Sequence, residues 1–270
     1  MTTSWVNGQR AAGIAIEDRG LQYGDGLFET ITCIDGRPRW LALHLERLRR
    51  GCERLELRFD DFDSLGTEIG AHAAAEGRCI MKLILTRGPA RRRGYRPSGD
   101  ETPTRILTRY DWPPESPQAA AGFRVAVSSV TLGVNPLLAG LKHLNRLEQV
   151  LAQSAIRAAP LEEVLMLSSA GDVIGGTMSN VFFADDNGLF TPSLADCGVA
   201  GVMRRLVCTA AERHGAPVRE RRVGRLELAH VREAFLTNVR WGVQSIALLE
   251  GRPLAQRGCS QSVRGWLGAA

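Results

Sequence analysis

The sequence predicts an α+β fold built from two mixed α/β domains. Segments with strand character outnumber helical segments in both halves, which favours α+β over a doubly wound parallel sheet. Between the halves, Asp111–Pro117 carries three prolines within five residues, which excludes a helix or a central strand there. We therefore expect a small N-terminal domain over residues 1–114 and a larger C-terminal domain over residues 115–270, joined by this proline-rich linker.

In the N-terminal half, a strand over 5–6 is expected to turn and return over 13–16, and a glycine-punctuated loop covers 18–26. Alternating polar and apolar residues predict a strand over 28–34. Apolar spacing predicts an amphipathic helix over 40–57. A further helix is expected over 62–75. Two strands are expected over 80–86 and 104–108, with a basic loop over 87–97 between them.

The C-terminal half is expected to begin with a strand and then to present a loop that runs into a buried helix just after residue 142. Further strands are expected over 163–167, 180–184, 189–191, 218–223, 234–238 and 244–249. The first strand of this half covers 123–130, and three helices cover 201–214, 226–231 and 260–267. The Asp-Asn-Gly sequence at 186–188 predicts a hairpin turn.

Composition narrows the class of protein. The 270 residues are 44% hydrophobic, which suffices for a large core, and no apolar run approaches a membrane span of about 18 residues. The N-terminus lacks signal-peptide character, so a cytoplasmic protein is expected. Six scattered cysteines without a C-x-x-C pair predict reduced thiols and no metal site. The net charge of +5 allows either a nucleic acid or an anionic small molecule as partner.

Lysine usage points to one residue. Lysine and arginine together number 34, yet only Lys82 and Lys142 are lysines. An arginine stays protonated and forms no Schiff base, whereas a lysine amine can once it is neutral. Lys142 could be a leftover surface residue, but the apolar residues around it at helical spacing favour a functional position.

Two other segments could bind an anion. Gly198–Arg204 is a glycine-flanked loop that leads into a helix, whose first amides favour a phosphate, although G-x-x-G alone is also an ordinary turn. Arg47 lies one turn after His44, and the alternative for this helix is a solvated basic face. The loop Arg91–Arg96 could bind RNA or a polyanion, but such loops are usually solvated and only Tyr95 supplies an aromatic ring.

Motifs for other chemistries are missing from the sequence. It contains no H-E-x-x-H, no G-x-S-x-G, no Walker A and no Rossmann glycine pattern. One candidate cofactor chemistry remains, a lysine-bound aldehyde whose phosphate is anchored elsewhere.

Six segments in order resemble the fold-type IV class of pyridoxal-phosphate-dependent enzymes, and within it most closely the family of 4-amino-4-deoxychorismate lyases. The resemblance covers nearly the whole chain, and it rests on 18–30, His44–Leu48, Leu141–Gln149, Thr177–Phe182, Gly201–Arg204 and Phe235–Asn238. It implies pyridoxal 5'-phosphate as cofactor, held between the two domains, with Lys142 as its Schiff-base and catalytic lysine. Cofactor binding by Arg47, by the amides of Val202 and Met203 and by Asn238 is implied as well.

The resemblance further implies conversion of 4-amino-4-deoxychorismate to 4-aminobenzoate and pyruvate, a step of folate supply. Thr30, Arg93 and Tyr95 are candidates for binding this small dicarboxylate substrate. Family members are commonly homodimers, so a homodimer is expected, with neither nucleic acid nor membrane as partner.

One position departs from the family pattern. The family usually has a glutamate that pairs with the pyridine nitrogen just before the Thr-x-Ser-Asn segment, and this chain has Gly175 instead. Such a carboxylate strengthens the electron sink, so its loss favours a lyase, whose elimination forms an aromatic ring, over an aminotransferase. Restoring a glutamate at 175 and following cofactor absorbance would test this. The alternatives are a branched-chain or D-amino-acid aminotransferase of the same fold and a non-catalytic basic binding protein.

Overall fold

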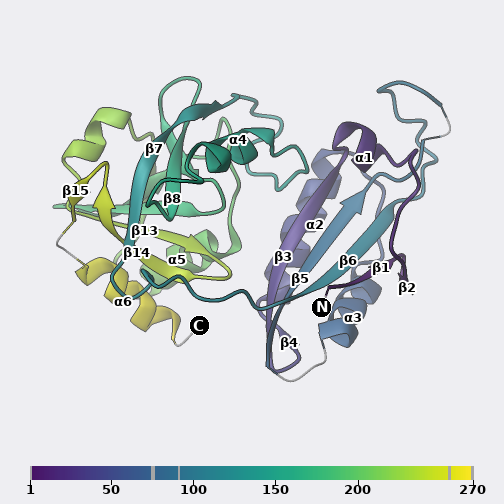
Figure 1. Ribbon diagram of the computed structural model, residues 1–270, viewed down its shortest axis with the longest axis horizontal. Helices are drawn as coiled ribbons and strands as arrows, with labels where there is room; N and C mark the ends of the chain where they lie inside the picture. Colours follow the sequence, from purple (N-terminus) through teal and green to yellow (C-terminus); the bar gives the residue numbers. More distant parts are fainter. Residues whose placement is uncertain (1, 74–76, 91, 255–256, 269–270) are drawn as a thin grey trace. The chain divides into compact units, whose positions relative to one another are not determined.

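The chain is shown as a computed structural model in Figure 1, which describes residues 2–73, 77–90, 92–254 and 257–268. It forms two compact units, one of Met1–Pro114 with Leu141–Asn145 and the other of Glu115–Gly140 with Arg146–Ala270. Both units mix helices with sheets, as the α+β prediction required.

The first unit contains a six-stranded sheet within the described residues, in the order β2-β1-β6-β5-β3-β4. Its central strands are β3 (Gly26–Ile34), β5 (Arg78–Thr86) and β6 (Thr104–Asp111), and its outer strands are β1 (Thr3–Val6), β2 (Gln9–Arg10) and β4 (Arg37–Pro38). β3 pairs with β5 in an antiparallel register along its full length. β3 therefore has one edge covered by β5, while its other edge pairs with β4 only at residues 33–34.

Three helices complete the first unit: α1 (Arg19–Tyr23), α2 (Leu41–Arg54) and α3 (Phe62–Ala73). α2 packs against β3, and α3 against β5 and β6. The approach of α2 is close, because a Cβ at Gly51 would lie 2.6 Å from a methyl carbon of Leu27. The face of β3 that carries Leu27, Glu29 and Ile31 is thereby buried under α2.

Residues 142–144 lie along the remaining edge of β3. The amide of Phe28 donates to the carbonyl oxygen of Lys142 at 2.9 Å, and the amide of Leu144 donates to Gly26 at 3.1 Å. This pairing places Lys142 in the first unit, whereas the sequence assigned the lysine to the C-terminal domain. The reason is that β3 offers unpaired main-chain groups, which a sequence pattern does not reveal.

The second unit contains a nine-stranded sheet in the described part of the chain, ordered β12-β11-β10-β13-β14-β7-β8-β9, with β15 paired to β14. Its strands are β7 (Phe123–Leu132), β8 (Glu163–Ser168), β9 (Val173–Gly176), β10 (Asn180–Asp185), β11 (Gly188–Pro192), β12 (Arg219–Arg221), β13 (Glu233–Asn238), β14 (Gly242–Leu249) and β15 (Arg252–Pro253). Its helices are α4 (Leu147–Ala155), α5 (Val202–Arg213), the 3₁₀ helix η1 (Arg225–Ala229) and α6 (Gly258–Leu267). Stacked rings of Phe182 and Phe235, 5.1 Å apart, join β10 to β13 in the core.

Several elements differ from prediction. The expected strand over 13–16 is wrong, because Asn7 and Gly8 both have positive φ and turn the chain at once into β2. The predicted loop over 18–26 contains α1, since the Asp18 side chain accepts from the Gly20 amide and caps it. β9 was not predicted. Residues 74–75 of the expected helix over 62–75 lie outside the described residues.

The helix after Lys142 also differs from prediction. It begins only at Leu147, and its apolar residues Leu147, Val150 and Leu151 are 77%, 55% and 58% exposed. The expectation of a buried helix was therefore wrong, since apolar spacing identifies a helix face but not what covers it.

Candidate active site

Lys142 is fixed by its main chain and directed by its side chain. Its carbonyl is bonded to β3, and its Nζ lies 4.1 Å from the centroid of the Phe28 ring. In such a cation–π arrangement the electron-rich face of the ring attracts the ammonium group. Lys142 is partly buried.

The first unit brings three charged or polar side chains together beneath β3. Arg47 Nε donates to Glu29 Oε1 at 2.8 Å, and Arg47 Nη2 donates to Glu29 Oε2. His44 Nδ1 lies 2.6 Å from Glu29 Oε2. Glu29 and His44 are buried, whereas 15% of the Arg47 side chain is exposed. We call Glu29, His44 and Arg47 the α2–β3 cluster.

The protonation of this cluster follows from its surroundings. Burial alone would raise the pKa of Glu29, but the adjacent Arg47 and His44 outweigh it and lower that pKa to about 2. Burial lowers the pKa of His44. A neutral His44 next to an ionised Glu29 must donate from Nδ1, so its Nε2 carries the lone pair. Within the described residues Nε2 has no hydrogen-bond partner.

The candidate substrate residues also belong to the first unit. Thr30 lies on the same face of β3 as Phe28, two residues along the strand. Arg93 and Tyr95 are exposed on the basic loop, whose Arg91 lies outside the described residues.

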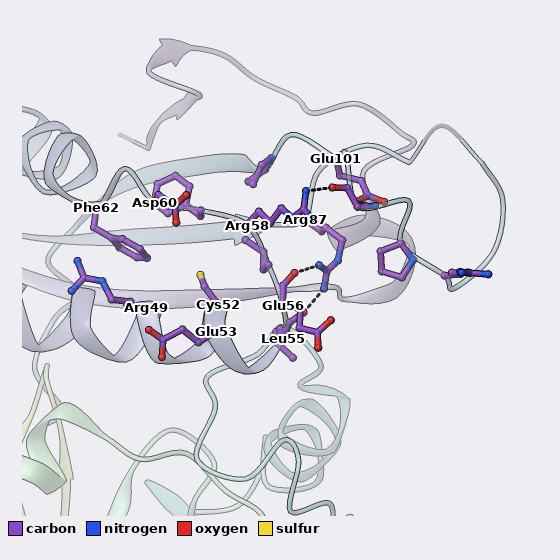
Figure 2. A pocket seen from close by; sticks show the side chains of 16 residues that line it. Arg49, Cys52, Glu53, Leu55, Glu56, Arg58, Asp60, Phe62, Arg87 and Glu101 are labelled. Atoms are coloured by element: carbon purple, nitrogen blue, oxygen red, sulfur yellow. Dashed lines mark hydrogen bonds between the residues drawn. The ribbon is translucent and has the colours of Figure 1, made fainter.

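A buried arginine holds this loop. Arg19 donates to the carbonyl oxygens of Gly94 and Tyr95 at 3.2 and 2.7 Å, and to Asp25 at 2.8 Å. Asp25 also accepts from Arg87, whose other donors reach the carbonyl oxygens of Leu55 and Glu56 at the end of α2 (Figure 2). The pKa of Asp25 is lowered, because the two arginines outweigh the effect of its burial.

The remaining cofactor candidates belong to the second unit. α5 begins after Gly201 without a side-chain cap, so the amides of Val202 and Met203 have no acceptor within the helix. The loop before it is braced by Asn180, whose Nδ2 donates to the Val199 carbonyl oxygen at 2.9 Å. Gly201 permits this contact, because a Cβ there would lie 2.1 Å from Asn180 Oδ1.

Asn238, at the end of β13, has its side chain engaged in a turn. Its Oδ1 accepts from the amides of Arg240 and Trp241 at 3.0 and 2.8 Å, and its Nδ2 donates to the Met178 carbonyl oxygen at 3.4 Å. Asn238 thus shapes the end of β13 and meets the segment that follows β9. Its contact with a cofactor stays a prediction.

The chain resembles proteins of known type along almost its whole length. The pattern of the Amino-transferase class IV family matches residues 26–249. An aminodeoxychorismate lyase of Vibrio harveyi is 33% identical over 244 residues, covering 90% of this chain and 90% of that one. A crystal structure of 4-amino-4-deoxychorismate lyase from Pseudomonas aeruginosa has a TM-score of 0.91 and 41% identity, covering 97% and 98% of the two chains. A putative branched-chain-amino-acid aminotransferase of Methanocaldococcus jannaschii is 27% identical, covering 90% and 85%.

This chain belongs to the class IV aminotransferase family. The fold-type IV resemblance drawn from the sequence is thereby confirmed.

Gly175, where the resemblance to the family led us to expect a glutamate, lies on β9. A Cβ there would lie 2.8 Å from the Ser179 carbonyl oxygen, so any side chain at 175 requires the backbone to shift. The substitution Gly175→Glu would therefore move the backbone of β9 as well as restore a carboxylate.

Glu163, at the start of β8, is a buried carboxylate that sequence reasoning missed. Its Oε1 accepts from the amide and hydroxyl of Thr177 and from Gln153, and its Oε2 from the amide of Met178 and the hydroxyl of Ser179. Both oxygens accept hydrogen bonds from the 177–179 segment, so Glu163 anchors this segment. A charged residue opening an otherwise apolar strand was the available signal.

The residues of this class IV chain suit pyridoxal phosphate. Lys142 supplies a primary amine for the aldehyde, Arg47 supplies a fork of donors for phosphate, and the start of α5 supplies amides. The first unit holds Lys142, Arg47, Thr30, Arg93 and Tyr95, and the second holds Val202, Met203 and Asn238.

A pocket of about 640 Å³ lies elsewhere on the first unit (Figure 2). Its lining includes Arg49, Cys52, Glu53, Asp60 and Glu101, and none of the predicted site residues lines it. Acidic and basic side chains line it in equal number, so no ligand charge is favoured. Among the described residues no helix is long and apolar enough to cross a membrane.

Proposed function

We propose that this chain is a pyridoxal-phosphate-dependent lyase that converts 4-amino-4-deoxychorismate to 4-aminobenzoate and pyruvate. The observation that carries the proposal is the position of Lys142, bonded to β3 next to the α2–β3 cluster, in a chain 41% identical to a lyase structure over 97% of its length. Lys82 is the second of the two lysines in the sequence and the alternative source of such an amine.

The chemistry divides between the cofactor and the chain. When bound, the cofactor supplies an electron sink at the carbon that bears the substrate amine. The amine of Lys142 would hold the cofactor, and the same amine, when free and neutral, would take the proton from that carbon. The bond between the neighbouring ring carbon and the enolpyruvyl oxygen would break, with the electron pair leaving on that oxygen. The released enolate would take up a proton to become pyruvate, and the six-membered ring would become aromatic.

The other residues bind and orient. Arg47 and the amides of Val202 and Met203 hold the cofactor phosphate. Arg93 and Tyr95, on a loop clamped by Arg19, meet the substrate carboxylates, and Thr30 and Asn238 line the site. The net charge of +5 favours the approach of a dianionic substrate.

The alternative function is amino-group transfer, which the Methanocaldococcus relative supports. Gly175 argues against it, because a weaker electron sink harms transamination more than an elimination that gains aromaticity. A substrate pair of D-alanine or a branched-chain amino acid with 2-oxoglutarate separates the two: we expect 4-aminobenzoate formation to exceed transfer by orders of magnitude.

The first test is formation of 4-aminobenzoate by the purified protein with pyridoxal phosphate. We expect product with the wild type and with the control Lys82→Arg, and none with Lys142→Ala. Borohydride reduction should attach the cofactor to the peptide that contains Lys142. Attachment at Lys82, or activity in Lys142→Ala, would contradict the proposal.

We also propose a cytoplasmic homodimer that binds neither nucleic acid nor membrane. The homodimer is supported by the family resemblance and by the exposed apolar face of α4, formed by Leu147, Val150 and Leu151. The cytoplasmic location rests on the sequence, and the six cysteines are free thiols in the structure.

A further inference from the structure

The α2–β3 cluster is more elaborate than a phosphate-binding arginine needs. Glu29 is a buried carboxylate on a strand whose neighbouring inward residues, Leu27 and Ile31, are apolar. Placing an ionised carboxylate there is costly unless it is paired. Its partners are Arg47 and His44, both from α2, so the cluster joins one strand to one helix.

The contact with Glu29 fixes the plane of the Arg47 guanidinium. Nε and Nη2 each donate to a different oxygen of Glu29, which is the bidentate fork arrangement. A guanidinium bound this way cannot rotate about its last side-chain bonds. Its orientation is therefore set before any ligand arrives.

His44 keeps Glu29 in place. Its Nδ1 donates to the same oxygen that Arg47 Nη2 reaches, so Oε2 receives two donors. Because the pKa of His44 is lowered by burial, the ring stays neutral near pH 7 and adds no positive charge. The charged groups that act electrostatically on His44 are Glu29, Arg47 and Lys142. The pair of Glu29 and Arg47 is then close to electrically neutral.

We propose that Glu29 and His44 are positioning residues that orient Arg47 for the phosphate of the cofactor, an inference that rests on the proposed function. A preoriented arginine loses little side-chain freedom when it binds, and this strengthens binding. The effect applies only to a ligand that carries the phosphate. An aldehyde without phosphate does not gain from it.

The test compares two ligands, pyridoxal phosphate and pyridoxal, by titrating the absorbance of their adducts with the protein. The variant Glu29→Gln keeps the shape of the side chain. It replaces one accepting oxygen with an amide N–H group, which cannot accept a hydrogen bond from the Arg47 guanidinium. We expect its affinity for pyridoxal phosphate to fall roughly 10- to 100-fold, the range known for outer-shell residues of metal sites, while its affinity for pyridoxal changes less than about threefold.

Two further variants and a control sharpen the test. Glu29→Asp keeps the charge and should recover part of the phosphate preference. His44→Leu removes one donor but leaves the Arg47 fork, so a smaller loss is expected, and it keeps the test available if Glu29→Gln fails to fold. Glu46→Gln is the matched control, because Glu46 pairs with Arg50 on the exposed side of the same helix.

The outcomes separate the inference from the proposed function. Equal loss for both ligands, or an unchanged ratio in Glu29→Gln and His44→Leu, overturns the positioning role and leaves the lyase proposal standing. A wild type that binds neither ligand overturns the proposed function, and the inference with it. A selective loss for the phosphate-bearing ligand supports the inference.

Discussion

Glu29 shows how one residue can link stability to pH. The pKa of its carboxyl is lowered to about 2, below the ordinary value of 4.5, since Arg47 and His44 outweigh the effect of burial. A group with a lowered pKa in the folded state contributes stability above its ordinary pKa and loses it as pH falls through the folded value. The relevant window therefore lies between about pH 4.5 and pH 2.

We expect the free energy of unfolding to fall across this window, with Glu29 accounting for a loss on the order of 3 kcal/mol. Urea unfolding at a series of pH values measures it. Glu29→Gln should be less stable near neutral pH and show a shallower decline in acid. A decline as steep as that of the wild type would place the acid sensitivity in other carboxylates.

Gly176 supports a second prediction about a single residue. A Cβ at this position would lie 2.2 Å from Ser179 Oγ and 2.7 Å from Glu163 Oε2, so it would displace the anchor of the 177–179 segment. We expect Gly176→Ala to lower the free energy of unfolding by about 1–3 kcal/mol, as overpacking does. Gly171 has a φ of +90° and open space around an added Cβ. The variant Gly171→Ala therefore measures backbone strain without crowding, for comparison with Gly176→Ala. A neutral Gly176→Ala would show that Glu163 has room to move.

The sequence predicted candidates for the reactive residues but not the contacts that hold them in place. Lys142 and Arg47 were predicted from amino-acid usage and motif resemblance. The pairing of Glu29 with His44 and Arg47 was not, because it depends on how α2 lies across β3, and local patterns do not encode that placement. Asn180 was part of a recognised motif, but its bond to Val199 joins the start of β10 to a loop that is distant in the chain.

At the scale of elements, the loop that carries Arg93 and Tyr95 depends on Arg19. Three donors of Arg19 are used, and its Cζ lies 5.0 Å from the Tyr23 ring, which in turn meets the Tyr95 ring edge-on. Lysine lacks the fork geometry and cannot replace these contacts.

We expect Arg19→Lys to free the loop, so that trypsin cuts after Arg92 and Arg93 roughly tenfold faster, since charge-assisted hydrogen bonds are worth about 1.5–3 kcal/mol. Mass spectrometry of the early fragments locates the cuts. Arg10→Lys, an exposed position on β2, is the control. Equal cleavage rates in the two variants would show that Arg19 does not restrain the loop.

Elements with strong periodicity were predicted well, and those that depend on distant partners were not. β3, α2 and α5 were predicted within a few residues of their ends. β9 was missed because two of its four residues, Gly175 and Gly176, have little strand character and pair only through their contact with β8.

At the scale of the molecule, the exposed apolar face of α4 bears on the assembly of the protein. Glu148, on the same helix, accepts from the amide of Gly133 at 2.8 Å, and the segment after Gly133 exposes two more apolar side chains, Val134 and Leu137. Apolar surface on a helix and on the segment tied to it is typical of an interface.

We expect the wild type to sediment as a dimer and Leu151→Glu to shift it towards the monomer. A buried glutamate at an apolar interface has no partner, so its cost exceeds that of the lost contacts. Leu226→Glu is the control, because Leu226 is 87% exposed on η1. A monomeric wild type, or equal effects of both substitutions, would contradict an interface on α4.

The chain leaves the first unit after Pro114, returns for Leu141–Asn145 and leaves again. An isolated fragment ending at Pro114 would therefore have unpaired hydrogen-bonding groups at Gly26 and Phe28, where the missing segment pairs. Such a fragment should self-associate or bind other peptides along this unpaired edge of β3. The two halves of this protein are thus poor candidates for separate expression, and a split version would need residues 141–145 supplied to the N-terminal piece.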